Sequence, residues 1–220
     1  MLYSISFKKL SFATVFSVAL SSLALMCAGG VAAADDEITA KATQEITTDM
    51  VLGDANAPVS IVEYASFTCG HCATFHNLVF DKIKENYIDT GKVKFTFREV
   101  YFDKFGLAGS LIARCDVDTE FYYNYSDKLF EKQREWMKSK DEAELLSRFQ
   151  DIAVELGQTE AKFQSCLSNN ENADTLLAWY HNNADKDGIR STPSFIINGE
   201  KHSNMSYENM SAIIDAALNK

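Results

Sequence analysis

The feature that most constrains this 220-residue chain is a long proline-free stretch with a helical period, set between two segments with a β pattern. The sequence has two prolines, Pro58 and Pro193, and both lie outside the stretch from Phe105 to about Asp187. Because proline disrupts helix interiors, this distribution permits a block of consecutive helices. We expect helices at about 106–117, 119–137, 141–156, 159–168 and 171–186.

The segments on either side of this block have the period of strands. Val59 to Phe67 is apolar and β-branched, and residues 93–98 alternate apolar with polar side chains. Ser194–Asn198 is a third predicted strand and leads into a hairpin, and a last amphipathic helix starts near Ser206. A β-α-β unit followed by β-β-α can form one mixed sheet with helices on both faces. The predicted fold class is therefore α/β, with an all-helical insertion.

The first residues are typical of an export signal. Lys8 and Lys9 precede an apolar stretch, and Ala32-Ala33-Ala34 fits a cleavage site before Asp35. An uncleaved membrane anchor is one alternative, because the apolar stretch is long, and a lipoprotein signal at Cys27 is another. We expect a cleaved signal peptide at 1–34 and an exported mature chain.

The mature chain is acidic. Without residues 1–34 it has 31 acidic and 19 basic side chains, a net charge of −12. This balance argues against nucleic acid and anionic membranes as partners. The predicted organisation is a flexible segment at 35–48, an α/β domain at 49–104 and 188–220, and a helical insertion domain at 105–187.

Cys69-Gly70-His71-Cys72 lies where the first long strand is followed by a helix. Unpaired N–H groups at a helix N-terminus favour thiolate over thiol, and His71 can add a positive charge or a donor beside Cys69. A stabilised thiolate is a good leaving group, so a Cys69–Cys72 disulfide would be easily attacked and oxidising. Cys72, one turn into the helix, is expected to be the less exposed, resolving sulfur.

Two other uses of the thiol pair have to be weighed. A disulfide across so short a loop constrains the unfolded chain little, which argues against a plain structural staple. Cys69, Cys72 and His76 could supply three zinc ligands, but no second Cys/His pair offers a fourth. His76 is otherwise expected at the surface. The sequence favours redox chemistry, and we expect no metal and no cofactor, since no Gly-rich phosphate loop is present.

Two distant features fit a thiol site. Pro193, preceded by Thr192, lies just before a predicted strand. A cis proline at this position would bring the backbone beside the thiols. A trans proline at the edge of the strand is the alternative. Glu63 interrupts an apolar strand six residues before Cys69. If buried, it could pass a proton to or from Cys72; otherwise it is an ordinary edge or surface acid.

The cysteine count predicts a second disulfide. Cys69, Cys72, Cys115 and Cys166 remain after residue 34, and an even number in an exported protein suggests two bridges. Three pairings are formally possible. The close spacing of Cys69 and Cys72 favours 69–72 together with 115–166.

Together these motifs resemble the thioredoxin superfamily, and the helical block resembles the insertion of DsbA-like thiol:disulfide oxidoreductases of the bacterial periplasm. The similar segments are Phe67–Cys72, Ser191–Gly199 and Leu129–Trp136, within a resemblance that covers nearly all of residues 50–220. The resemblance implies a thioredoxin fold. It also implies roles: Cys69 as nucleophile, Cys72 as resolving thiol, His71 as thiolate stabiliser, Pro193 as cis proline and Glu63 as buried acid.

The sequence departs from the best-known oxidases of that family, which have proline in place of Gly70 and valine in place of Thr192. Gly-His between the cysteines and Thr before the cis proline look more like disulfide isomerases, which implies a milder oxidant. Cys115 and Cys166 resemble an extra disulfide found in an alphaproteobacterial subset. Redox tuning is one interpretation of that bridge, and a staple between two helices is the favoured one.

The predicted function is a periplasmic oxidase that passes the Cys69–Cys72 disulfide to unfolded or reduced exported proteins. A membrane oxidase that regenerates it is implied by the family alone. A disulfide isomerase or reductase is the nearest alternative, and a chaperone or metal-binding module using the same groove is the alternative from another class. Because only a short polar segment precedes the fold, without room for the dimerisation region of bacterial isomerases, we expect a monomer.

Overall fold

The structure, a computed structural model, describes residues 46–220; the predicted signal peptide, Cys27 and residues 35–45 of the predicted segment at 35–48 lie outside the described residues. Its centre is a five-stranded sheet in the order β1-β3-β2-β4-β5. The strands are β1 (Val51–Leu52), β2 (Val59–Ala65), β3 (Val93–Glu99), β4 (Ser194–Ile197) and β5 (Glu200–Ser203). Strands β2 and β3 are parallel, and the other neighbouring pairs are antiparallel. The mixed sheet confirms the predicted thioredoxin fold.

One long helix connects β2 to β3. It consists of α2 (Gly70–Phe75), the π-helical turn η1 (His76–Phe80), α3 (Asp81–Ile83) and a second π-helical turn, η2 (Lys84–Ile88). A π-helical turn contains an extra residue, so it shifts which side chains face the sheet. A regular helical period predicts Val79 on the buried face, whereas the structure buries Phe80 and leaves Val79 half-buried.

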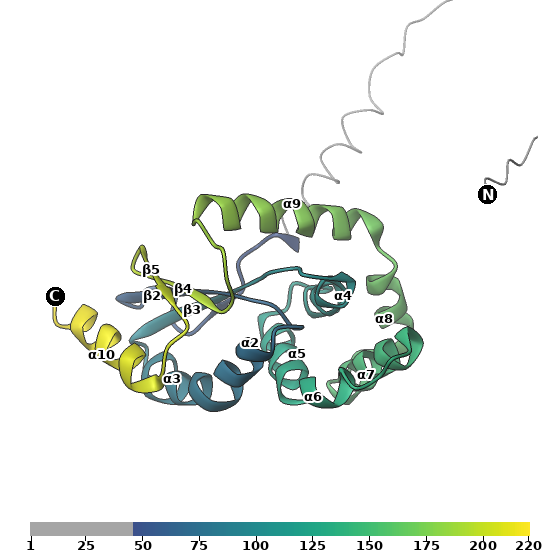
Figure 1. Cartoon of the computed structure of the whole chain (residues 1–220), viewed down its shortest axis with the longest axis horizontal. Coiled ribbons are helices and arrows are strands. Elements are labelled where there is room, and N and C mark those ends of the chain that lie inside the picture. Colours follow the sequence, from purple (N-terminus) through teal and green to yellow (C-terminus); the bar gives the residue numbers. More distant parts are fainter. Residues whose placement is uncertain (1–45) are drawn as a thin grey trace, which may run out of the picture.

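The predicted helical block lies between β3 and β4. Its helices are α4 (Lys104–Ala113), α5 (Thr119–Glu131), α6 (Gln133–Trp136), α7 (Glu142–Glu155), α8 (Glu160–Leu167) and α9 (Asn170–Lys186). Most begin at an Asp, Thr or Asn whose side chain accepts a hydrogen bond from a backbone N–H of the first turn. The single helix expected at 119–137 is divided at Lys132. Figure 1 shows α4 to α8 gathered beside the sheet.

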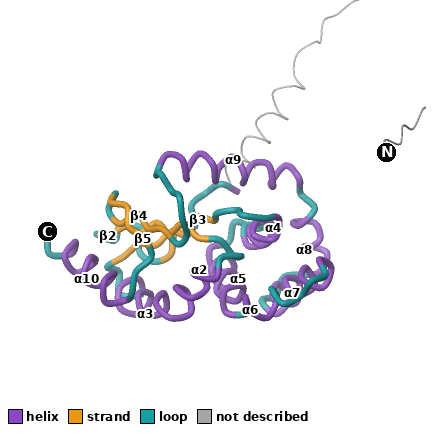
Figure 2. The backbone as a smooth tube through the Cα atoms, viewed as in Figure 1, coloured by secondary structure: helices purple, strands orange, loops and turns teal. Residues whose placement is uncertain are grey.

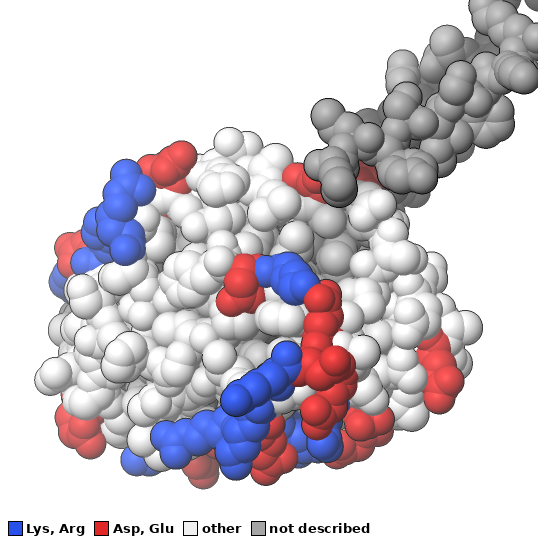
Figure 3. Space-filling view, turned by 45° about the vertical axis from the view of Figure 1, so that its right-hand side comes forward, with Lys and Arg blue, Asp and Glu red and all other residues white. Residues whose placement is uncertain are grey.

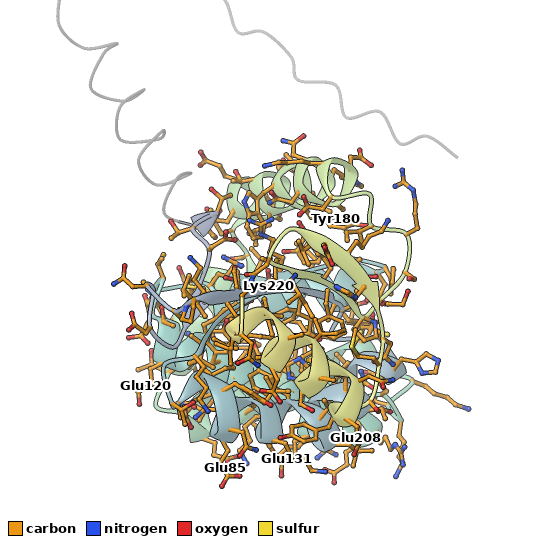
Figure 4. All side chains as sticks on the ribbon, turned by 90° about the vertical axis from the view of Figure 1, so that its left-hand side faces the viewer. Glu85, Glu120, Glu131, Tyr180, Glu208 and Lys220 are labelled. Atoms are coloured by element: carbon orange, nitrogen blue, oxygen red, sulfur yellow. A yellow bond between two sulfur atoms is a disulfide. The ribbon has the colours of Figure 1, made fainter. Side chains whose placement is uncertain are left out.

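Helices cover both faces of the sheet, as Figures 1 and 2 show: α9 lies over one face, and α3 and α10 (Tyr207–Leu218) lie over the other. Alternate side chains of β2 enter two different cores. Tyr64 packs with Ala184 of α9, whereas Ile61 and Ala65 join the main core. In Figure 4 the labelled Tyr180 of α9 and Glu131 of α5 mark the two opposite sides of the molecule. Glu63 lies two positions after Ile61 on β2, so its side chain is on the same face of the sheet and points into the main core.

The main core is rich in aromatic rings from the sheet and from α5. Tyr122, Tyr123 and Tyr125 of α5 are almost fully buried. On the surface, Figure 3 shows basic and acidic side chains interleaved along the lower edge, below a broad uncharged area. Within residues 46–220 the helices are all too short or too polar to traverse a bilayer.

Candidate active site

The two thiols lie at the junction between β2 and α2. Cys69 is the N-cap of α2, is half-buried, and accepts a hydrogen bond at its sulfur from the Cys72 backbone N–H at 3.4 Å. Cys72 is fully buried in the main core. Both are free thiols. Of the two sulfurs, therefore, Cys69 is the one that another molecule can reach.

The surroundings shift the pKa values of the two sulfurs in opposite directions. The hydrogen bond from the Cys72 thiol is the largest factor that lowers the pKa of Cys69 to about 5; the Thr192 side chain and the backbone N–H groups of Cys72 and His71 contribute further, against the effect of partial burial. Burial raises the pKa of Cys72 far above its ordinary value, and the hydrogen bond to Cys69 and the charge of Glu63 add to this. Cys69 is thus a thiolate and Cys72 a thiol near neutral pH.

The backbone of His71, rather than its ring, contacts the nucleophile. Its N–H is one of the groups that stabilise the Cys69 thiolate. The side chain is exposed, and within residues 46–220 its ring makes no hydrogen bond or ion pair. A role of the His71 ring in thiolate stabilisation stays a prediction.

The segment around Pro193 lies beside the thiols. The Thr192–Pro193 peptide bond is cis, and Pro193 is buried. The carbonyl oxygen of Thr192 lies 3.7 Å from the Cys69 sulfur. Strand β4 starts at the next residue and pairs antiparallel with β2, with Ser194 opposite Tyr64. The strand pairing therefore brings residues more than 120 positions apart to one site.

Glu63 is fully buried beneath the thiol pair, and it is paired with a residue that we expected elsewhere. His76 was predicted at the surface; that expectation is wrong, since its side chain is buried and its Nε2 lies 2.9 Å from Glu63 Oε2. The sequence held a signal for this position. His76 follows Cys72 by four residues, so the two share a helix face.

Comparison with known proteins identifies the family. The family model described as Thioredoxin matches residues 45–216. The solved structure of alpha-DsbA1 from Wolbachia pipientis aligns with a TM-score of 0.73 and 32% identity, covering 78% of this chain and 92% of that chain. This chain belongs to the DsbA-like thioredoxin family.

Two curated sequences extend the comparison of this DsbA-like chain. A Rickettsia bellii protein named "Putative protein-disulfide oxidoreductase" is 36% identical over 77% of this chain and 64% of its own length, so this chain spans less than two thirds of that relative. Disulfide bond formation protein D of Bacillus subtilis is 28% identical, with 76% of each chain covered.

Gln133 fixes the active-site loop of the DsbA-like chain from the helical block. Its Nε2 donates to the carbonyl oxygens of Phe67, at 2.6 Å, and Cys69, at 3.0 Å, and its side chain is buried. In the sequence, Gln133 lies within the segment Leu129–Trp136 that resembles the family, and that resemblance predicts no role for it. A long-range contact between two loops leaves no local pattern, so nothing else in the sequence indicates it.

A groove runs beside Gln133. It has a volume of about 440 Å³ and lies between α2, η1 and the α5–α6 junction, with Gly70, Thr74, Leu78 and Arg134 among its walls. Leu78, which is 64% exposed, is an apolar side chain on its wall. Gly70, the residue after Cys69, also lines the groove, so the groove extends to the active-site loop.

The second cysteine pair is a disulfide in the helical block. Cys115 follows α4 and Cys166 lies in α8, with a Cα–Cα distance of 5.7 Å. The described residues contain no cluster of three His, Cys, Asp or Glu side chains suited to a metal ion. His76, weighed above as a third zinc ligand with the two thiols, is paired with Glu63 instead.

Proposed function

We propose that this chain is an exported thiol:disulfide oxidase that introduces disulfides into unfolded client proteins. The observation that carries the proposal is the opposite character of two sulfurs three positions apart. Cys69 is accessible and has a pKa of about 5, whereas Cys72 is buried with its pKa raised. An accessible sulfur that is stable as a thiolate is the one that a client attacks and that later leaves again.

The reaction starts from the Cys69–Cys72 disulfide. A client thiolate attacks the Cys69 sulfur, forms a client–Cys69 mixed disulfide, and breaks the S–S bond so that Cys72 leaves with the electron pair. A second client thiolate then attacks the client sulfur and releases Cys69 as a thiolate. The client gains a disulfide, and the protein ends with both cysteines reduced. Its two electrons pass to an oxidant, which we propose is a membrane oxidase.

Several residues would support these steps. Thr192 and Pro193 would position the client backbone beside Cys69, the His71 and Cys72 N–H groups would stabilise its thiolate, and the groove at Leu78 would hold apolar client segments. Glu63 would exchange a proton with Cys72. The names carried by the Wolbachia, Rickettsia and Bacillus relatives support the same class of reaction.

Refolding of ribonuclease separates oxidase from isomerase. We expect the oxidised protein to reactivate reduced ribonuclease without another oxidant, at one disulfide per protein molecule, and to be slow on scrambled ribonuclease. Efficient reactivation of the scrambled enzyme by the reduced protein would instead support an isomerase. Cys115→Ser/Cys166→Ser serves as the matched control, because it removes two cysteines and leaves the active pair.

A Cys69→Ser variant tests the alternative from another class. If that variant still suppresses client aggregation as well as the unchanged protein and binds zinc at one ion per chain, the protein is a chaperone or metal-binding module. We expect it to lose all disulfide transfer and to bind no zinc.

Export, cleavage and oligomeric state form one further proposal. We expect a periplasmic monomer whose N-terminus is Asp35. Mass spectrometry of the protein from a periplasmic extract reads the N-terminus, and light scattering reads the mass in solution. A membrane-bound product that begins before residue 34 would establish an uncleaved anchor instead.

A further inference from the structure

Glu63 obtains no opposite charge from its own sheet. Its register neighbours are Phe97 on β3 and Phe195 on β4, and both are fully buried. A carboxylate in such a place needs a partner, because burying an unpaired charge is costly. The partner is the His76 ring from the helix above the sheet. A titratable base, and not a permanently charged side chain, therefore balances Glu63.

Cys72 and His76 are presented to Glu63 by the same helix face. The His76 backbone N–H bonds to the Cys72 carbonyl, so the two side chains are one turn apart. The imidazole is enclosed by aromatic rings, of which Phe130 stacks on it at 4.1 Å between centroids. Glu63 Oε2 takes the bond from His76, and Oε1 has no hydrogen-bond partner among the described residues. One carboxylate oxygen is thus left available on the side of the carboxylate that His76 does not occupy.

The far side of the His76 ring faces a small acidic pocket. This pocket has a volume of about 140 Å³ and is lined by His76, Asn77, Asp81, Asp127 and Glu131. Asp127 Oδ1 lies 3.7 Å from His76 Nδ1. The titratable groups that face the ring are Glu63 from β2, Asp127 and Glu131 from α5, Asp81 from α3 and Cys72 from α2; Glu131 is also paired with Lys128. Burial disfavours the charged ring, but Glu63 and Asp127 outweigh it and raise the pKa of His76 to about 9.

We propose that His76 relays the proton that Cys72 gains and loses in each redox cycle, and that it passes this proton between Glu63 and the solvent at the acidic pocket. The inference rests on the proposed disulfide exchange and adds a residue to it. His76 acts through Glu63 and not on the sulfur itself, so it is a positioning residue in this reaction.

The proton balance of the cycle closes with water at the acidic pocket as the source and sink of the proton. When the Cys69–Cys72 bond breaks, Cys72 leaves as a thiolate with the electron pair. Glu63 takes a proton from Nε2 of the His76 imidazolium and passes it to this sulfur, and the ring regains a proton from water at the pocket. The protein with free thiols therefore has a charged His76 ring, in agreement with its raised pKa. When Cys72 later attacks the sulfur of a mixed disulfide at Cys69, its S–H proton passes to Glu63 and on to Nε2, while the ring releases its Nδ1 proton to water.

Ellman's reagent reads the two sulfurs separately in one stopped-flow trace. In the protein with Cys69 and Cys72 reduced and Cys115–Cys166 intact, Cys69 attacks the reagent and releases the first thionitrobenzoate. Cys72 then attacks the mixed disulfide at Cys69 and releases the second, which requires loss of its proton. The rate of the first phase therefore reports the reactivity of Cys69 alone. The rate of the second phase reports how fast Cys72 loses its proton to an acceptor.

We expect His76→Gln to slow the second phase about tenfold or more at pH 7 and to make its rate climb with pH, while the first phase changes less than about twofold. Glutamine can still bond to Glu63 but carries no exchangeable charge in this range. His181→Gln is the matched control, since His181 is an exposed histidine on α9, and both of its phases should be unchanged.

Three results would overturn the inference. A second phase in His76→Gln equal to that of the unchanged protein would show that the hydrogen bond, which glutamine keeps, is sufficient. Equal slowing of both phases would assign His76 a structural role. An unchanged protein that releases only one thionitrobenzoate would remove the proposed disulfide exchange together with the relay, and so is distinguishable from the first two results.

Discussion

Two buried carboxylates on neighbouring parallel strands have different partners. Glu99 on β3 receives two bonds from Arg114, at 2.7 and 2.8 Å, and Arg114 also donates to the carbonyls of Ile46 and Thr48. Glu63 on β2 receives one bond, from His76, and keeps an oxygen without a partner. Arginine does not titrate near neutral pH, whereas histidine does. The Glu99–Arg114 pair is fully bonded and permanently charged, and it ties the N-terminal segment to α4. The Glu63–His76 pair is half-bonded and titratable, so it can exchange a proton.

The largest effect should come from breaking the Glu99–Arg114 pair. Arg114→Met leaves a buried carboxylate without its partner, so we expect the free energy of unfolding to fall by about 3–5 kcal/mol. Urea unfolding followed by tryptophan fluorescence measures it. The double variant Arg114→Met/Glu99→Leu should recover most of the loss, and a single-variant loss below about 1 kcal/mol would contradict the assignment.

The pH dependence of stability should separate the two pairs. His76 has its pKa raised from 6.5 to about 9 in the folded chain, so the stability it adds is fully present below pH 6.5 and is lost as the pH rises through 9. The difference between the unchanged protein and His76→Gln should therefore shrink by roughly 3 kcal/mol across this window. The difference caused by Arg114→Met should stay constant there. A constant difference for His76→Gln would contradict a charged ring.

The two acids should also respond differently to the same replacement. Glu63→Leu removes an under-bonded carboxylate and lets His76 become neutral, so we expect a change of unfolding free energy within about 1 kcal/mol. Glu99→Leu leaves the buried guanidinium unpaired and should cost at least about 3 kcal/mol. Urea unfolding of both variants at pH 7 measures this pair of values. Equal losses would show that both acids are purely structural.

The smallest effect should follow from Asp127→Asn. Asp127 is 43% exposed and 3.7 Å from the His76 ring, so its charge is screened by solvent. We expect the pKa of His76 to move down by less than about half a unit, which NMR titration of the ring can follow. A fall to the ordinary value of 6.5 would mean that Asp127, and not Glu63, holds the charge.

The order of strands and helices could be predicted because each element carries its own period and ends at a glycine or a cap. The division of the expected helix at Lys132 could not, since the contacts of Gln133 with a distant loop override local propensity. At the site, Cys69 and Cys72 are marked by their spacing. His76 was misplaced because its burial depends on Glu63, which lies 13 residues away on another element.

The Gln133 contacts have a mechanical consequence. A single amide from α6 is bonded to the carbonyls on both sides of Thr68, so these two bonds tie the helical block to the reactive loop. Displacement of α6 by an ångström would stretch both bonds and shift the carbonyl of Cys69 with it. A molecule that presses only on the helical block would therefore be sensed at the sulfur, without touching it.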